Sequence, residues 1–235
     1  MIVFTIVIPT YNERENIVPL VRALYGLGIP DLYVLVVDDA SPDGTADAVD
    51  ALRGEFPGVE VLRRPGKMGL GSAYVEGFTR ALEAGADVVI QMDADFSHDP
   101  ADVARLIAAL EARADVAVGS RRVAGGSIVG WHWQRHLASK GAQTLARMLL
   151  RLKTRDITSG FRAFRHSCLA AIHFSDVRSN GYAFQEEMLL RCERGHFLIM
   201  EVPVRFVDRA CGNSKLGIKD VVEFFTIMAK LWWKK

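Results

Sequence analysis

The chain has 235 residues, 50% of them hydrophobic, and a formal net charge of +1 at pH 7. This length predicts one large domain with an ample core, and the near-neutral charge argues against a general nucleic-acid binder. Its three cysteines are far apart in the sequence and show no metal-ligand spacing, which favours a reducing compartment. We recognise no signal peptide, and no apolar stretch reaches the roughly 20 residues of a membrane span.

Apolar runs alternate with helical patterns through the first half of the chain. The predicted strands are Thr5–Pro9, Tyr33–Val37, Val59–Leu62, Val88–Met92 and Val116–Ser120. The predicted helices are Asn16–Tyr25, Thr45–Arg53, Gly71–Glu83 and Pro100–Arg113. This alternation predicts an α/β fold with a mostly parallel, Rossmann-like sheet flanked by helices. Ligands of such sheets bind beyond the carboxyl ends of the strands.

Polar clusters follow three of these predicted strands, at Thr10–Glu13, Asp38–Asp39 and Asp93–Asp95. Asp93 and Asp95 stand out because they directly follow a strand that is apolar enough to be buried. Two carboxylates in such a place are costly without a cation, and Mg²⁺ or Mn²⁺ with a bound diphosphate would balance them. A plainer alternative is that this motif only ends a strand and begins a loop.

The second half of the chain has a different pattern. Trp131–Leu152 reads as a long basic helix, Thr158–Phe164 as a strand or loop, and Gln185–Arg194 as a helix. Met200–Phe206 resembles a strand that Pro203 restricts to an edge or bulged position. We expect a polar loop at Gly212–Lys215 and an amphipathic helix over Ile218–Trp233.

Positive charge is concentrated in one window of the chain. Val116–Arg155 contains no Asp or Glu, and its basic residues are Arg121, Arg122, Arg135, Lys140, Arg147, Arg151, Lys153 and Arg155. This favours a surface for phosphates or lipid headgroups over a solvated helix face. The final Trp232-Trp233-Lys234-Lys235 is typical of a membrane interface, although a terminal helix docked on the core would also fit.

Several motifs together resemble a known family. Pro9–Glu13, Val37–Thr45, Gly66–Gly71 and Asp93–Asp95 with His98 and Pro100 resemble the inverting family-2 glycosyltransferases with the GT-A fold. Gly119–Arg121, Thr158–Arg162, Gly181–Met188, Val207–Arg209 and Ser214–Leu216 resemble, more narrowly, the dolichol-phosphate (polyprenol-phosphate) mannose synthases. The resemblance covers nearly the whole chain, in the family's order and spacing.

The resemblance implies a reaction, partners and a location. Mannose would pass from GDP-mannose to a polyprenyl phosphate, with inversion, giving a β-linked product and GDP in a metal-dependent step. It implies a catalytic domain over residues 1–216 and a possible membrane-interface helix over 217–235. We therefore expect peripheral attachment to the cytoplasmic face of a membrane, with an integral membrane protein as a possible further partner and no nucleic acid.

The resemblance also assigns roles to matching positions. The expected donor-binding residues are Pro9, Tyr11, Glu13, Val37, Asp39, Asp93, Ala94, Asp95, Arg121, Arg209 and Lys215. Asp95 is expected as the principal metal ligand, aided by Asp93 and, through water, by Ser97. Asp95, Arg121, Arg209 and Lys215 are the residues expected to carry catalysis.

The chemistry of the acceptor shapes one further hypothesis. A phosphate monoester is already largely a dianion at neutral pH, so no side chain needs to act as an obligatory base. We expect Arg121, with Arg135 assisting, to position this nucleophile, and Glu187 to buttress the site rather than react. Two alternatives stay open: a UDP-glucose or UDP-N-acetylhexosamine donor, and a non-catalytic nucleotide-binding scaffold.

Overall fold

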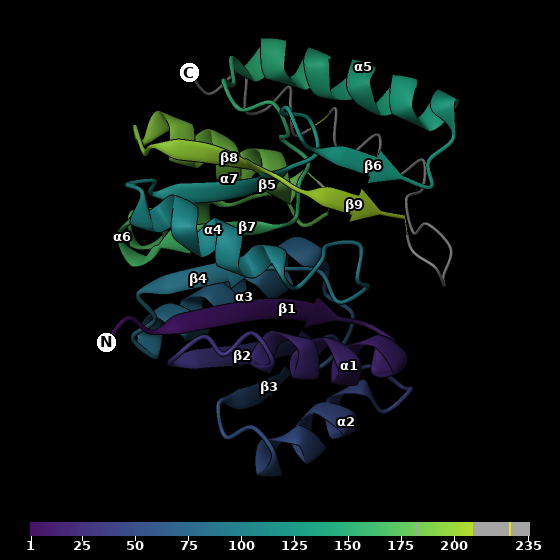
Figure 1. The fold of residues 1–235 in the computed structure, drawn as a ribbon, viewed down its shortest axis with the longest axis vertical. Helices are drawn as coiled ribbons and strands as arrows, with labels where there is room; N and C mark the ends of the chain where they lie inside the picture. Colours follow the sequence, from purple (N-terminus) through teal and green to yellow (C-terminus); the bar gives the residue numbers. More distant parts are fainter. Residues whose placement is uncertain (182, 209–225, 227–235) are drawn as a thin grey trace.

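The computed structural model describes residues 1–181, 183–208 and 226, and within them a seven-stranded sheet forms the centre of the molecule (Figure 1). Its order is β3 (Val59–Arg63), β2 (Leu32–Asp38), β1 (Phe4–Thr10), β4 (Val88–Gln91), β7 (Arg162–Arg165), β5 (Val116–Ser120) and β8 (Ile199–Pro203). Only β7 runs antiparallel to its neighbours in this sheet. The predicted α/β fold with a mostly parallel sheet is therefore confirmed.

Helices cover both faces of the sheet because successive strand residues point to opposite sides. Ile6 and Ile8 of β1 belong to a core beneath α1 (Arg14–Tyr25), α2 (Thr45–Ala51) and α4 (Asp102–Glu111). Val7, between them, belongs to a second core beneath α3 (Leu70–Glu83), α6 (His166–Ala170) and α7 (Phe184–Arg194). Figure 1 shows α1 and α4 in front of the sheet and α3 and α7 behind it.

A glycine brings α3 unusually close to the sheet. A Cβ at Gly77 would lie 2.4 Å from Cγ1 of Val7 and 3.0 Å from Cγ2 of Val37. A larger residue would therefore push the helix outward. The close approach matters for function, because α3 carries a side chain that reaches the end of β4.

The second half of the chain departs from regular α/β alternation. The predicted strand Met200–Phe206 is wrong as a single strand, because the chain leaves β8 at Pro203 and forms β9 (Arg205–Val207) in a separate ribbon with β6 (Ser127–Val129). Val204 is the point of exchange: its N–H donates to Ser120 O (3.0 Å), while its carbonyl accepts from Ser127 N (3.1 Å). The expected edge position of Pro203 is confirmed, since β8 ends the large sheet.

The long basic helix is present as α5 (Trp133–Leu150), which lies beyond β6 at the border of the molecule in Figure 1. Short 3-10 helices occupy Leu52–Gly54 and Phe174–Asp176. Among the described residues, no helix has both the length and the apolar character needed to cross a bilayer. The predicted loop Gly212–Lys215 and almost all of the predicted terminal helix lie outside the described residues.

Candidate active site at the carboxyl edge of the sheet

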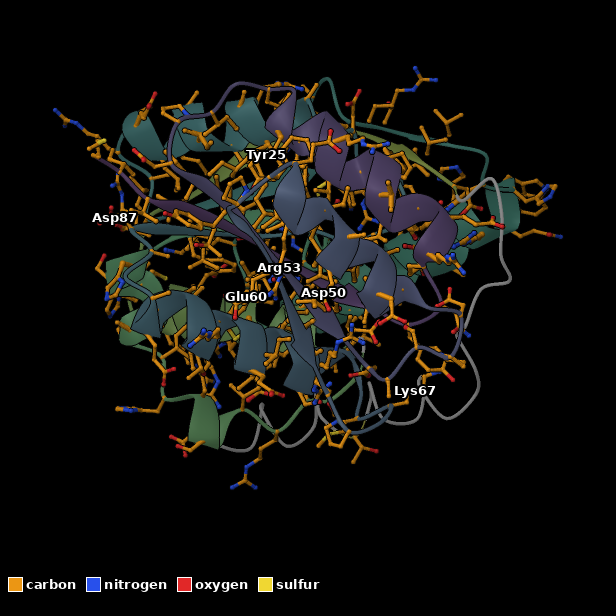
Figure 2. All side chains as sticks on the ribbon, turned by 90° about the horizontal axis from the view of Figure 1, so that it is seen from below. Tyr25, Asp50, Arg53, Glu60, Lys67 and Asp87 are labelled. Atoms are coloured by element: carbon orange, nitrogen blue, oxygen red, sulfur yellow. The ribbon has the colours of Figure 1, made fainter. Side chains whose placement is uncertain are left out.

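The parallel strands β1, β2 and β4 end at one edge, so the three polar clusters that follow them are brought together. Thr10 is in register with Asp38, and its hydroxyl donates to Asp38 Oδ1 at 2.9 Å. In Figure 2, Lys67 lies at this side of the molecule, whereas Asp87, which precedes β4, lies at the opposite side. This edge is where the topology predicts a ligand.

Asp38 and Asp39 are buried and have different tasks. Asp38 closes a tight turn by accepting from the N–H and the hydroxyl of Ser41, at 2.9 and 2.6 Å. Asp39 forms an ion pair with Arg64 and accepts from the N–H groups of Met68 (3.1 Å) and Gly69 (3.3 Å). Asp39, a predicted donor-binding residue, thus fixes the loop between β3 and α3 beside the site.

The predicted nucleotide-binding residues in β1 and directly after it line the same edge. Tyr11 lies beneath Lys67, whose Nζ is 4.3 Å from the ring centroid. Glu13 precedes α1, donating its N–H to Thr45 Oγ1 (3.0 Å) and accepting from Asn16 Nδ2 (2.8 Å). Pro9 belongs to β1 itself.

Val37 and Ala94 can offer a nucleotide little more than their main chains. The Val37 side chain is fully buried in the core beneath α3, and Ala94 packs into the core on the other face. Their predicted contacts to the donor therefore remain predictions for backbone atoms rather than for side chains.

The carboxylates of Asp93 and Asp95 are half-buried and held by neighbouring hydroxyl groups. Asp93 Oδ1 accepts from Tyr74 Oη at 2.9 Å. Asp95 Oδ1 accepts from Ser97 N at 3.0 Å and also from the Ser97 hydroxyl. Ser97 thus orients Asp95, and its own role toward a metal stays a prediction.

This donor set fits a hard divalent cation. Two aspartates at a strand end supply carboxylate oxygens, the ligands that Mg²⁺ and Mn²⁺ prefer. Within the described ranges, no cluster of three or more His, Cys, Asp or Glu side chains is arranged to hold a metal by itself. A Mg²⁺ ion held by two carboxylates would take the rest of its shell from substrate phosphates and water.

Arg121 is locked against Asp156 at the end of β5. Its Nε and Nη2 donate to the two carboxylate oxygens at 2.7 and 2.6 Å, and its N–H adds a third bond of 2.8 Å. Burial by itself would raise the pKa of Asp156, but the hydrogen bonds and charge of Arg121 outweigh it and lower that pKa. Arg121 therefore sits in a rigid position with its charge already paired.

The other cations predicted for phosphate binding are placed differently. Arg135 forms an ion pair with Asp208 (2.7 Å) and lies over the ring of Trp131, 4.1 Å from its centroid. Arg209 and Lys215 lie outside the described residues. Their predicted contacts to the donor phosphates remain predictions.

His98 and Glu187 serve the walls of the site. His98 stacks on Phe161 (5.0 Å between centroids), and burial followed by the charge of Arg121 lowers its pKa to about 4, so the ring is neutral. Glu187 is fully buried and accepts from the N–H groups of Arg178 (3.0 Å) and Ser179 (2.9 Å) and from Arg191 Nη2 (2.7 Å). Its contacts are those of a buttress.

Sequence reasoning missed three contributors to the site. Tyr74 lies among apolar residues of a helix and reads as core; only the hydroxyl in an otherwise buried stripe could have signalled a polar target. Arg64 lies next to Arg63 and reads as surface charge, although its side chain is buried. Asp156 gives no sign of its partner in the sequence, whereas the structure pairs it with Arg121.

Comparison with known proteins assigns this architecture to a family. Residues 5–172 match the model described as "Glycosyl transferase family 2". The polyprenol monophosphomannose synthase of Mycolicibacterium smegmatis is 44% identical over 219 residues, covering 93% of this chain and 82% of that protein. The undecaprenyl-phosphate mannosyltransferase of Micrococcus luteus is 47% identical over 211 residues, covering 90% of this chain and 86% of its own length.

Solved structures share the fold at lower identity. Glucosyl-3-phosphoglycerate synthase from Mycobacterium tuberculosis, in complex with Mn²⁺, UDP-glucose and phosphoglyceric acid, superposes with a TM-score of 0.71 at 19% identity, covering 98% of this chain and 80% of that one. A mannosyltransferase from Pyrobaculum calidifontis in complex with GDP-Man and Mn²⁺ gives a TM-score of 0.62 at 18% identity, covering 97% of this chain and 64% of that one. At these identities the likeness concerns the fold.

Proposed function

The chain belongs to glycosyltransferase family 2, and from this we propose that it transfers mannose from GDP-mannose to polyprenyl phosphate with inversion at the anomeric carbon. The single observation that carries the proposal is the identity of 44% and 47% to two relatives named as polyprenyl-phosphate mannosyl transferases, each matched over most of its length. The carboxyl-edge site supports it, because it combines a carboxylate pair with a fixed arginine.

Transfer from a nucleotide sugar separates an anionic diphosphate from an anomeric carbon that gains positive charge. Asp93 and Asp95 would hold a divalent cation, Mg²⁺ or Mn²⁺, which when bound would neutralise the diphosphate as it leaves. Ser97 keeps Asp95 in place through the bonds to Oδ1. Asp39 and Arg64 keep the loop at Lys67–Gly69 against the nucleotide end of the site.

The acceptor needs a position more than it needs a base. Its phosphate has a second pKa of about 6 and is largely a dianion at neutral pH. Arg121, held by two hydrogen bonds that its guanidinium donates to Asp156, offers that phosphate a group of fixed orientation. Because its charge is paired, we expect it to orient the nucleophile and to rely on Arg209 and Lys215 for additional charge.

Helix α5 is the proposed contact with the membrane that holds the lipid acceptor. Its inner side buries Gln143, Ala146 and Leu150, while Trp133, Leu137 and Met148 are 71%, 65% and 66% exposed. Lys140, Arg147 and Arg151 lie on or just after the helix. Apolar side chains flanked by cations suit an interface with anionic lipid, which supports peripheral attachment at the cytoplasmic face.

Transfer of radiolabelled sugar tests the function directly. GDP-mannose, UDP-glucose and UDP-N-acetylglucosamine are compared as donors to polyprenyl phosphate in detergent with Mg²⁺ or Mn²⁺. We expect labelling from GDP-mannose, its loss with EDTA, and a rate at least about 100-fold lower for Asp95→Ala. Asp102→Ala is the matched control, since among the described residues the Asp102 side chain pairs with Arg105 on the same helix, α4 (2.8 Å).

The alternatives give different results in the same assay. Labelling only from a UDP-sugar would keep the reaction type and replace the donor. Nucleotide binding with no labelling from any donor would contradict the proposal and favour a non-catalytic scaffold.

A further inference from the structure

Tyr74 on α3 is a buried polar group to which none of the proposed steps assigns a role. Its side chain is fully buried, and the other buried residues of α3 are apolar or glycine. Its hydroxyl lies 2.9 Å from Asp93 Oδ1. A buried hydroxyl needs a partner, and here the partner is a carboxylate of the candidate metal site.

The ring of Tyr74 is fixed by aromatic neighbours. It stacks on Phe184 of α7 with centroids 5.7 Å apart and an interplanar angle of 7°. Phe78, which also lies on α3, is 5.6 Å away at an angle of 32°. With the ring held from two helices, the hydroxyl points to one place, so its hydrogen bond is set before any ligand arrives.

The second oxygen of Asp93 lies beside a glycine. A Cβ at Gly160 would lie 3.0 Å from Asp93 Oδ2, a spacing tighter than ordinary van der Waals contact. The carboxylate therefore fits in this position because residue 160 has no side chain. Its Oδ1 accepts from the Tyr74 hydroxyl, and its Oδ2 lies where a larger residue at position 160 would meet it.

We propose that Tyr74 is a positioning residue that, in the space left by Gly160, holds the Asp93 carboxylate in the orientation that receives a divalent cation bound to a nucleoside diphosphate. This inference rests on the proposed function and deepens it. Removing such a support around a ligating carboxylate typically weakens metal binding by 10- to 100-fold.

The test measures Mn²⁺ binding rather than turnover. Mn²⁺ is titrated into the full chain in the presence of saturating GDP, and the free ion is followed by electron paramagnetic resonance. We expect Tyr74→Phe to weaken Mn²⁺ binding about 10-fold, because the ring and its packing remain while the donor is lost. GDP affinity without metal should stay unchanged. If Tyr74 only stabilised the fold, its loss would disturb GDP binding as well.

Tyr25→Phe is the matched control. Tyr25 also donates its hydroxyl, to Leu32 O at 3.3 Å, but it stacks on Phe56 on the other face of the sheet. Its loss should leave Mn²⁺ binding unchanged. Equal Mn²⁺ affinity in the wild type, Tyr74→Phe and Tyr25→Phe would overturn the inference.

Two further outcomes separate the inference from the function on which it rests. If wild-type protein with GDP binds no Mn²⁺, the proposed metal dependence fails. If Tyr74→Phe does not fold, Gly160→Ala places a methyl group against Asp93 Oδ2 and should also weaken Mn²⁺ binding. Unchanged affinity in that variant would count against the inference.

Discussion

Helices α4 and α5 differ in how much apolar surface they leave exposed. α4 buries Val103, Leu106 and Leu110 against the sheet, as a helix that covers a core should. α5 presents Trp133 and Leu137 to the outside and buries a glutamine. The difference shows that the two helices face different surroundings. α4 stabilises the domain, whereas α5 has exposed apolar surface that could contact a lipid bilayer.

The strongest test of this difference is to make the same Leu→Ala substitution in each helix and to compare the two losses of stability. Leu106 is fully buried, so Leu106→Ala should lower the free energy of unfolding by about 3 kcal/mol through lost burial and the cavity left behind. Leu137 is 65% exposed, so Leu137→Ala should change it by less than about 0.5 kcal/mol. Urea denaturation of the two variants measures both values, and similar losses would refute the contrast.

For membrane binding, the order of the two effects should be reversed: the α5 variant should be impaired and the α4 variant should not. Leu137→Ala should weaken binding to vesicles containing anionic lipid about 10-fold, because roughly 1.5 kcal/mol of apolar burial is lost. Leu106→Ala should bind as the wild type does under conditions where it is folded. Co-sedimentation with vesicles gives the partition coefficients. Unchanged partition for Leu137→Ala would remove the outer side of α5 from the interface.

The smallest predicted effect is the pH dependence of stability that a buried carboxyl group on α7 causes. Glu186 on α7 is 1% exposed, and its Oε2 has no hydrogen-bond partner among the described residues. Burial raises its pKa from 4.5 to about 8. The fold therefore favours the protonated form, so this stabilisation is complete below the unfolded-state pKa and is lost as pH rises through about 8.

Unfolding free energies at pH 7 and pH 9 measure that loss. The wild type should lose about 1 kcal/mol more than Glu186→Gln between these pH values, since the amide does not ionise. Glu111→Gln, an exposed change at the end of α4, should follow the wild type. A Glu186→Gln profile that parallels the wild type would show that Glu186 does not titrate in this range.

The fold of the first half was predictable because its strands and helices follow from local patterns of apolar residues. The predicted strand at Val116–Ser120 matches β5, and the other early strands and helices agree to within a few residues. Periodicity does not report pairing partners, however. The insertion of β7 as an antiparallel strand and the exchange at Val204 depend on segments far apart in the sequence.

The candidate site divides in the same way. That Asp39, Asp93 and Asp95 would share one edge followed from the parallel direction of the predicted strands. That Asp39 would bind Arg64, that Arg121 would bind Asp156 and that Asp93 would bind Tyr74 did not follow, because each pair joins different elements. Asp93 and Asp95 share a spacing that motifs can record, while Tyr74, which supports Asp93, lies on a different element.

The sequence by itself determined the alternation of strands and helices, the edge at which the polar clusters gather, and the family resemblance that its motifs carry. Only the tertiary structure decided which of these side chains hold one another: Tyr74 on Asp93, Arg64 on Asp39 and Asp156 on Arg121. The physical reason is the distance along the sequence over which each kind of interaction acts. Helical and strand periods arise between residues a few positions apart, whereas buried charges and hydroxyl groups are satisfied by whatever partner the packed core brings within about 3 Å.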